Sequence, residues 1–178
     1  MLTGRTPNLA DGATRPCPTL VLGLGNLLLR DEGVGVRVVQ ALERTRLPPG
    51  VEVVDGATAG LTLVDTLVGR RKVIVIDAFA GHHPPGTVSR LLPADLAPCP
   101  ARGVSLHEVG FLEALAATRH LGAAPEEVVI FGVQPQNVAC GLELSAEVAQ
   151  CVPEVVELVL AEVRPAAPAA PASPAPNA

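Results

Sequence analysis

The chain has 178 residues, of which 48% are hydrophobic, 17% are charged and 2% are aromatic, and its formal net charge is −5. This length fits a single domain with a sizeable core, and the apolar fraction excludes a chain that is disordered throughout. The negative charge, the scattered cations and the scarcity of aromatic side chains do not provide the basic stacking surface that nucleic acids require. We therefore expect no nucleic-acid partner.

Neither a membrane span nor an export signal is expected. The apolar run 19–29 ends at Arg30 and is shorter than the ~20 residues that a spanning helix needs. The first 18 residues carry charges and prolines, and no apolar run with a small-residue cleavage site occurs among them. The 4 cysteines form no CxxC pair, so we expect reduced, buried thiols in a cytoplasmic protein without membrane insertion.

We divide the chain into three parts. Residues 1–18 are expected to form a flexible N-terminal extension, residues 19–164 the folded domain, and residues 165–178 a disordered Pro/Ala-rich tail. Closely spaced prolines in the tail block helix and ladder hydrogen bonds, and alanine buries too little apolar surface to offset the entropy of ordering.

Apolar runs alternate with segments of helical period along the folded part. The run 72–77 has β-branched residues on both faces, which is typical of a strand inside a parallel sheet. Ser145 stands where the N-cap of the last helix is expected. Strands are predicted at 19–24, 51–55, 72–77, 87–92 and 128–133, and helices at 33–42, 61–68, 107–118 and 144–162. This order predicts a three-layer α/β sandwich, with a mostly parallel, twisted sheet and helices on both faces.

In such a fold the functional crevice lies outside the carboxyl ends of the strands, so the loops there are the candidates for chemistry. The glycine-rich loop after the first strand suggests a dinucleotide site, in which the backbone approaches a pyrophosphate. However, Leu28 occupies the third glycine position, and Asp31 and Glu32 put two carboxylates where phosphates would lie. Asp55, at the end of the second strand, is an acidic residue of the kind that binds a ribose in dinucleotide sites, so a nucleotide-dependent oxidoreductase stays an alternative function.

The same charges favour a cation. Glu32 and Asp77 follow strands that are expected to be neighbours, and His107 opens the next predicted helix. Two carboxylates and an imidazole suit a divalent transition metal with open coordination positions. Capping carboxylates and an exposed histidine are the alternative interpretation. His82 and His83, in a loop with Pro and Gly, are expected to face solvent; a base or an accessory metal ligand is the alternative role for either.

Several short blocks in order make the chain resemble one known family from Leu20 to about Val163. The blocks are Gly23-x-Gly-Asn26, Asp31-Glu-Gly-Val-Gly35, Asp55-Gly-x-Thr58 with Gly60, Ile76-Asp-Ala78, Ser105-x-His107, Gly132-Val-Gln-Pro135 and Leu144-Ser145. This pattern resembles the [NiFe]-hydrogenase maturation endopeptidases. The resemblance implies an enzyme that removes a C-terminal extension from the large-subunit precursor of a hydrogenase after nickel has been inserted. The metal-contacting residues of the family fall on Glu32, Asp77 and His107.

The resemblance also implies where the metal comes from. The chain has no HExxH motif, so no resident hydrolytic zinc is expected. Nickel would arrive with the precursor and be docked by Glu32, Asp77 and His107, which places the scissile peptide in the crevice. Two ways of activating the attacking water stay open. Glu32 or Asp77 can act as a general base, or nickel can polarise the water. A monomer is expected, and a non-catalytic nickel-binding checkpoint module that shares these residues is a second alternative.

Asn26, Asp55 and Thr58 are expected to help position the substrate, although Asn26 as a turn residue and Asp55 as a capping acid are the simpler interpretations. The family commonly has Asp-Gly-Gly-Thr where this chain has Ala57. A side chain at that position is strained if the backbone has positive φ.

Overall fold

The computed structural model describes residues 18–58, 60–96 and 106–164, without the side chains of 106–108. The predicted extension and the predicted tail lie outside these ranges, except for Pro18. The strands are β1 (Thr19–Leu24), β2 (Val51–Ala57), β3 (Lys72–Ala78), β4 (Val88–Leu91) and β5 (Glu127–Val133). The helices are α1 (Val34–Leu42), α2 (Leu63–Leu67), α3 (Leu106–His120) and α4 (Ala146–Val163), with 3-10 turns η1 (Arg30–Gly33) and η2 (Pro93–Leu96).

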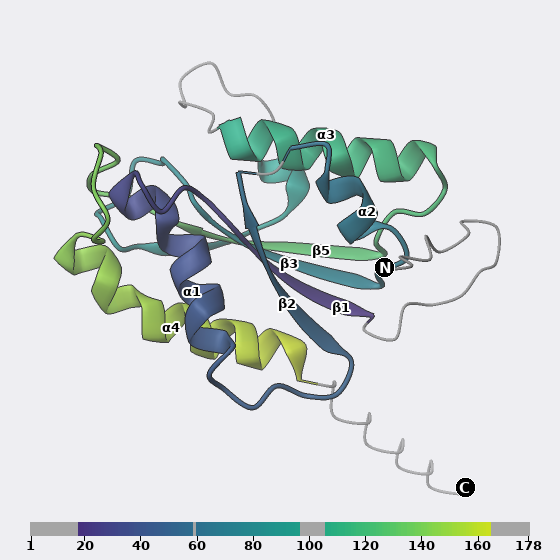
Figure 1. Cartoon of the computed structure of the whole chain (residues 1–178), viewed down its shortest axis with the longest axis horizontal. Helices are drawn as coiled ribbons and strands as arrows, with labels where there is room; N and C mark the ends of the chain where they lie inside the picture. The colour runs from purple at the N-terminus through teal and green to yellow at the C-terminus, as the bar shows by residue number, and fades with distance from the viewer. Residues whose placement is uncertain (1–17, 59, 97–105, 165–178) are drawn as a thin grey trace, which may run out of the picture.

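The strands form one sheet in the order β2-β1-β3-β5-β4. β1, β2, β3 and β5 run parallel, and β4 is antiparallel to β5. Figure 1 shows α1 and α4 on one face and α2 and α3 on the other, which confirms the three-layer sandwich. Along the chain, β1 is followed by β2, which pairs on one side of β1, and then by β3, which pairs on the other side of β1. The carboxyl ends of β1 and β3 therefore form the switch point at which α/β proteins bind ligands.

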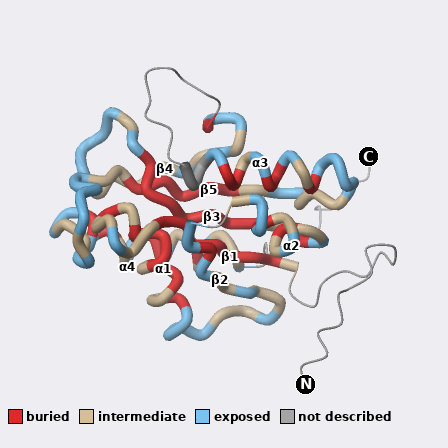
Figure 2. Tube along the Cα trace, turned by 45° about the horizontal axis from the view of Figure 1, so that its top comes forward, coloured by how far each residue is buried: buried red, intermediate tan, exposed pale blue. Residues whose placement is uncertain are grey.

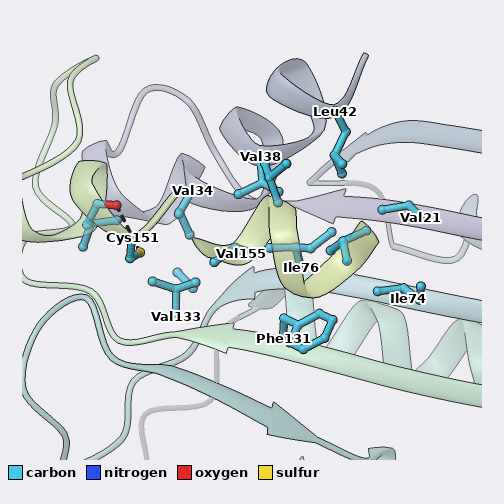
Figure 3. Packing of buried hydrophobic residues seen from close by; sticks show 14 of the residues in the cluster. Val21, Val34, Val38, Leu42, Ile74, Ile76, Phe131, Val133, Cys151 and Val155 are labelled. Carbon is cyan, nitrogen blue, oxygen red and sulfur yellow. Dashed lines mark hydrogen bonds between the residues drawn. The ribbon is translucent and has the colours of Figure 1, made fainter. Parts of the chain in front are cut away.

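Helices cover both faces of the sheet, and successive side chains along each strand point to opposite faces, so the central strands are buried on both. In β3, Ile74 and Ile76 face α1 and α4, whereas Val73 and Val75 belong to the cluster under α2 and α3. Figure 3 shows the first of these clusters, in which side chains from α1 and α4 pack over the sheet: Val34, Val38, Leu42, Val155, Val21, Ile74, Ile76 and Phe131. No helix in the described part of the chain is long and apolar enough to cross a membrane.

The two described cysteines differ from each other. Cys151 is buried, as expected, and its thiol donates to the carbonyl of Val148 at 3.1 Å (Figure 3). Burial, helped by the charge of Glu154, raises the pKa of this thiol to about 11, so it stays protonated. Cys140 is exposed, so the prediction of a buried thiol is wrong there. It lies in the long loop between β5 and α4, most of whose residues are exposed or half-buried. Cys17 and Cys99 lie outside the described residues.

Candidate active site

Two glycines allow the turn that carries Glu32 to pack closely against the ends of two strands. A Cβ at Gly35 would collide with the carbonyl oxygens of Leu24 and Ile76, so the first turn of α1 lies directly on the ends of β1 and β3. Gly25 has φ 130° and leaves room for the carbonyl of Glu32. These glycines therefore serve close backbone packing, and the half-buried Glu32 stands beside the end of β3.

Asp77 lies at that end of β3 and is only 4% exposed. It pairs with Gly132 of β5, and its Oδ1 accepts the N–H of Ala78 at 2.8 Å. The alternation of β3 turns its side chain toward α2 and α3, where it lines a cavity of about 10 Å³ together with Leu24, Val75, Phe79, Leu96, Phe111, Ile130 and Gly132. That is the space of about one water molecule. A carboxylate buried at the carboxyl end of a strand is the kind of group that active sites often contain.

His107 is the second residue of α3, so its backbone belongs to the same edge of the sheet. Gly110, one turn later, approaches the loop after β2 so closely that a Cβ on it would lie 2.9 Å from the Cα of Gly60. The imidazole of His107 lies outside the described side chains. Among the side chains that are described, no group of three His, Cys, Asp or Glu residues lies together as a metal site. The convergence of Glu32, Asp77 and His107 on a metal stays a prediction.

Asp31 does not face the crevice, contrary to the expectation that it adds a second carboxylate beside Glu32. It is 0% exposed and connects η1 to the loop between β5 and α4. Its Oδ2 accepts the N–H groups of Gln136 at 2.9 Å and Asn137 at 2.8 Å. Ser145 donates its N–H to Oδ1 at 2.6 Å and its hydroxyl to Oδ2 at 2.9 Å. Burial by itself raises the pKa of Asp31, but these hydrogen bonds together outweigh it and leave the pKa below its usual range.

Ser145 is at the N-cap position of α4, as predicted, but it makes no side-chain cap hydrogen bond. Its hydroxyl is used by Asp31 instead. A serine before a helix does not by itself reveal that a buried carboxylate competes for its hydroxyl, so the sequence could not show this contact.

The three expected positioning residues lie at the same edge, Asn26 and Thr58 on loops and Asp55 near the end of β2. Oδ1 of Asn26 accepts the N–H of Leu28 at 2.9 Å, and Oδ1 of Asp55 accepts the N–H of Ala57 at 2.8 Å. Both contacts are those of turn-forming residues. Asp55 and Thr58 are exposed, so they remain accessible to a substrate. His82 and His83 are exposed as well, as predicted.

Ala57 has φ 44°, so the strain foreseen from the sequence is present. We expect Ala57→Gly to raise the free energy of unfolding by about 0.5–1 kcal/mol, because relief of the left-handed strain exceeds the added flexibility of the unfolded chain. Urea unfolding followed by circular dichroism measures this. Ala116→Gly, at an exposed helical position of α3, should instead lose about 1 kcal/mol. Equal losses in both variants would contradict the strain.

The comparisons with known proteins agree with one another. The sequence model of the family described as "Hydrogenase maturation protease" matches residues 36–162, which include Asp77 and His107 and begin just after Glu32. The "Hydrogenase 2 maturation protease" of Escherichia coli K12 is 37% identical over 147 residues, which are 82% of this chain and 90% of that protein. The "Hydrogenase expression/formation protein HupM" of Azotobacter chroococcum is 40% identical over 140 residues, but this chain spans only 62% of its length.

Among solved structures, the hydrogenase maturating endopeptidase HybD of Escherichia coli superposes with a TM-score of 0.75 at 36% identity, covering 81% of this chain and 90% of that one. The fold and the matched residues define a peptide-bond hydrolase with an α/β sheet. The chain belongs to the hydrogenase maturation protease family. This membership places it with the endopeptidases and not with the nucleotide-dependent oxidoreductases.

Proposed function

We propose that the chain removes a C-terminal extension from the large-subunit precursor of a [NiFe] hydrogenase, and that nickel in the precursor is what it recognises. One observation carries this proposal. The turn that bears Glu32 is seated by Gly35 on the end of β3, beside buried Asp77, and α3 begins at the same edge with His107 in its first turn.

The donor set fits a metal that belongs to the substrate. Two carboxylates and one imidazole leave coordination positions for ligands from the precursor. Docking of the nickel on Glu32, Asp77 and His107 fixes the scissile bond relative to the carboxylates, and cleavage then depends on metal loading. The rate gain from this step is a positioning effect. No resident hydrolytic zinc is required in this scheme.

The chemical step is hydrolysis of one peptide bond. A water oxygen attacks the scissile carbonyl carbon, a carboxylate of Glu32 or Asp77 takes a proton from that water, and the proton passes to the departing amine. The products are a shortened large subunit with a new carboxyl end and a free peptide with a new amino end. Glu32 is half-buried, whereas Asp77 is almost fully buried. This difference favours Glu32 as the base that reaches a water at the crevice.

The setting of the reaction is part of the proposal. Free thiols at Cys140 and Cys151 support a reducing cytoplasm as the place of action. We propose that the enzyme acts as a monomer, with the precursor as its partner at the carboxyl edge of its sheet.

A cleavage assay tests the proposal. The purified chain is mixed with precursor that carries nickel, and in parallel with metal-free precursor, and the products are followed by gel electrophoresis and mass spectrometry. We expect only the nickel-loaded precursor to lose its extension. Binding of that precursor without shortening, seen in a pull-down, would instead support the checkpoint module. A precursor that is neither bound nor cut would overturn the function.

A further inference from the structure

Large hydrophobic side chains are exposed mainly at one edge of the sheet. Seven are exposed in the described part of the chain, and five of these lie on the loops or first turns at the carboxyl ends of the parallel strands: Leu28, Leu61, Val109, Val138 and Leu142. Single exposed apolar residues are ordinary on protein surfaces, but a gathering of them at one place marks an interaction site. Figure 2 shows the central strands β1 and β3 buried and the loops beyond them largely exposed.

Three of these residues belong to two loops that are joined to each other. Leu28 follows β1, and Val138 and Leu142 follow β5; they are 65%, 49% and 62% exposed. We call these three side chains the apolar rim. The carbonyl of Leu28 accepts the N–H of Gly141 at 2.9 Å, and the N–H of Arg30 donates to the carbonyl of Gly141 at 3.0 Å. The two loops therefore form one surface.

The backbone under the apolar rim is fixed. Asn26 holds the N–H of Leu28, and the Arg37 guanidinium donates to the carbonyl of Leu142 at 2.9 Å. Beneath both loops, buried Asp31 binds the backbone on either side of Val138 and Leu142, at Asn137 and Ser145. Exposed side chains on a fixed backbone form a preorganised surface, so little ordering entropy is lost when a partner covers it.

The apolar rim is continuous with the proposed catalytic edge. Glu32 lies four residues after Leu28, and its N–H donates to the carbonyl of Leu29 at 3.2 Å. Leu28 and Glu32 therefore belong to one short segment at the proposed catalytic edge. Resting on the proposed function, we infer that the apolar rim docks an apolar surface of the folded body of the large-subunit precursor, next to its metal centre. The enzyme thereby recognises the folded subunit in addition to its nickel.

The test compares exposed leucines at opposite ends of the sheet. Leu28→Ser and Leu142→Ser remove rim side chains, and Leu121→Ser is the matched control, since Leu121 is 57% exposed and follows α3 at the far end. We expect each rim variant to raise KM for nickel-loaded precursor, and the Kd for binding it, by about tenfold. The kcat of both should stay within about twofold of the wild type, and Leu121→Ser should change neither constant. Thermal melts confirm that all three variants are folded.

The outcomes separate this inference from the function on which it rests. If the wild type cuts the precursor and the rim variants keep the KM and Kd of Leu121→Ser, the rim is not a docking surface and the proposed function stands. If the wild type binds precursor without cutting it, the Kd comparison still decides the inference. If it neither binds nor cuts, both proposals fall. A wild-type dimer in light scattering that becomes monomeric on Leu28→Ser or Leu142→Ser would assign the rim to a second copy of the chain and overturn the inference.

Discussion

Replacement of Glu32 by Gln, or of Asp77 by Asn, is expected to slow cleavage of the nickel-loaded precursor by on the order of 10²- to 10⁴-fold while the protein stays folded. Each change keeps the size of the side chain and removes the charge that would hold the metal or take the proton. The amide of Asn can still accept the N–H of Ala78, which is the backbone contact that Asp77 makes now. Initial rates from gel densitometry, with circular dichroism as the check on folding, measure the effect.

Matched controls exclude a general effect of lost charge. Glu43→Gln removes an exposed carboxylate just after α1, and Asp95→Asn removes one whose Oδ2 accepts the N–H of Leu92. Both should retain the wild-type rate within about twofold. A folded Glu32→Gln or Asp77→Asn variant that cuts as fast as these controls would remove that residue from the active site.

Separate measurement of binding and turnover distinguishes docking from acid–base chemistry. Substitution of a residue that only docks the nickel should weaken binding of the nickel-loaded precursor and raise KM. Binding of the metal-free precursor should not change. A residue that takes the proton should lower kcat and leave binding close to that of the wild type. From its half-buried position, Glu32 is expected to show the larger effect on kcat.

The sequence predicts the layers and the sheet well because burial on both faces imposes a strong pattern. β3 reads as a continuous β-branched run, and it is found at 72–78 with both faces buried. The prediction that the strands preceding Glu32 and Asp77 are neighbours is also confirmed, since β1 and β3 are adjacent in the sheet and Gly23 pairs with Ile76. Parallel strands linked by helices leave few other arrangements.

The sequence could not show which of two adjacent carboxylates faces the crevice. Asp31 and Glu32 have the same charge and neighbouring positions, and only the path of the loop between β5 and α4 decides that Asp31 is enclosed. That path depends on contacts between residues more than 100 positions apart, which no local pattern reports.

Replacement of Asp31 by Ala is the substitution for which we expect the largest loss of stability, about 3–5 kcal/mol. Ala leaves the N–H groups of Gln136, Asn137 and Ser145 without their acceptor and releases the loop that braces the Glu32 turn. Because whole domains are stable by only about 5–15 kcal/mol, this loss removes a large share of the total. Urea unfolding at pH 7 measures it. Asp95→Ala, which loses a single exposed hydrogen bond, should cost about 1 kcal/mol or less.

The pH dependence of this loss follows from the lowered pKa of Asp31. Burial opposes the charged form, but the hydrogen bonds from Ser145, Asn137 and Gln136 prevail, so the pKa in the folded state lies below the ordinary value of 3.8. A group with a lowered pKa contributes stability above its unfolded-state pKa and loses it as the pH falls through the folded-state value. The difference in unfolding free energy between wild type and Asp31→Ala should therefore stay constant from pH 7 down to about pH 4 and narrow only below that. If the difference in unfolding free energy already decreases between pH 7 and pH 5, the four hydrogen bonds do not hold Asp31 as a carboxylate. The stability of the loop under the Glu32 turn would then have another origin.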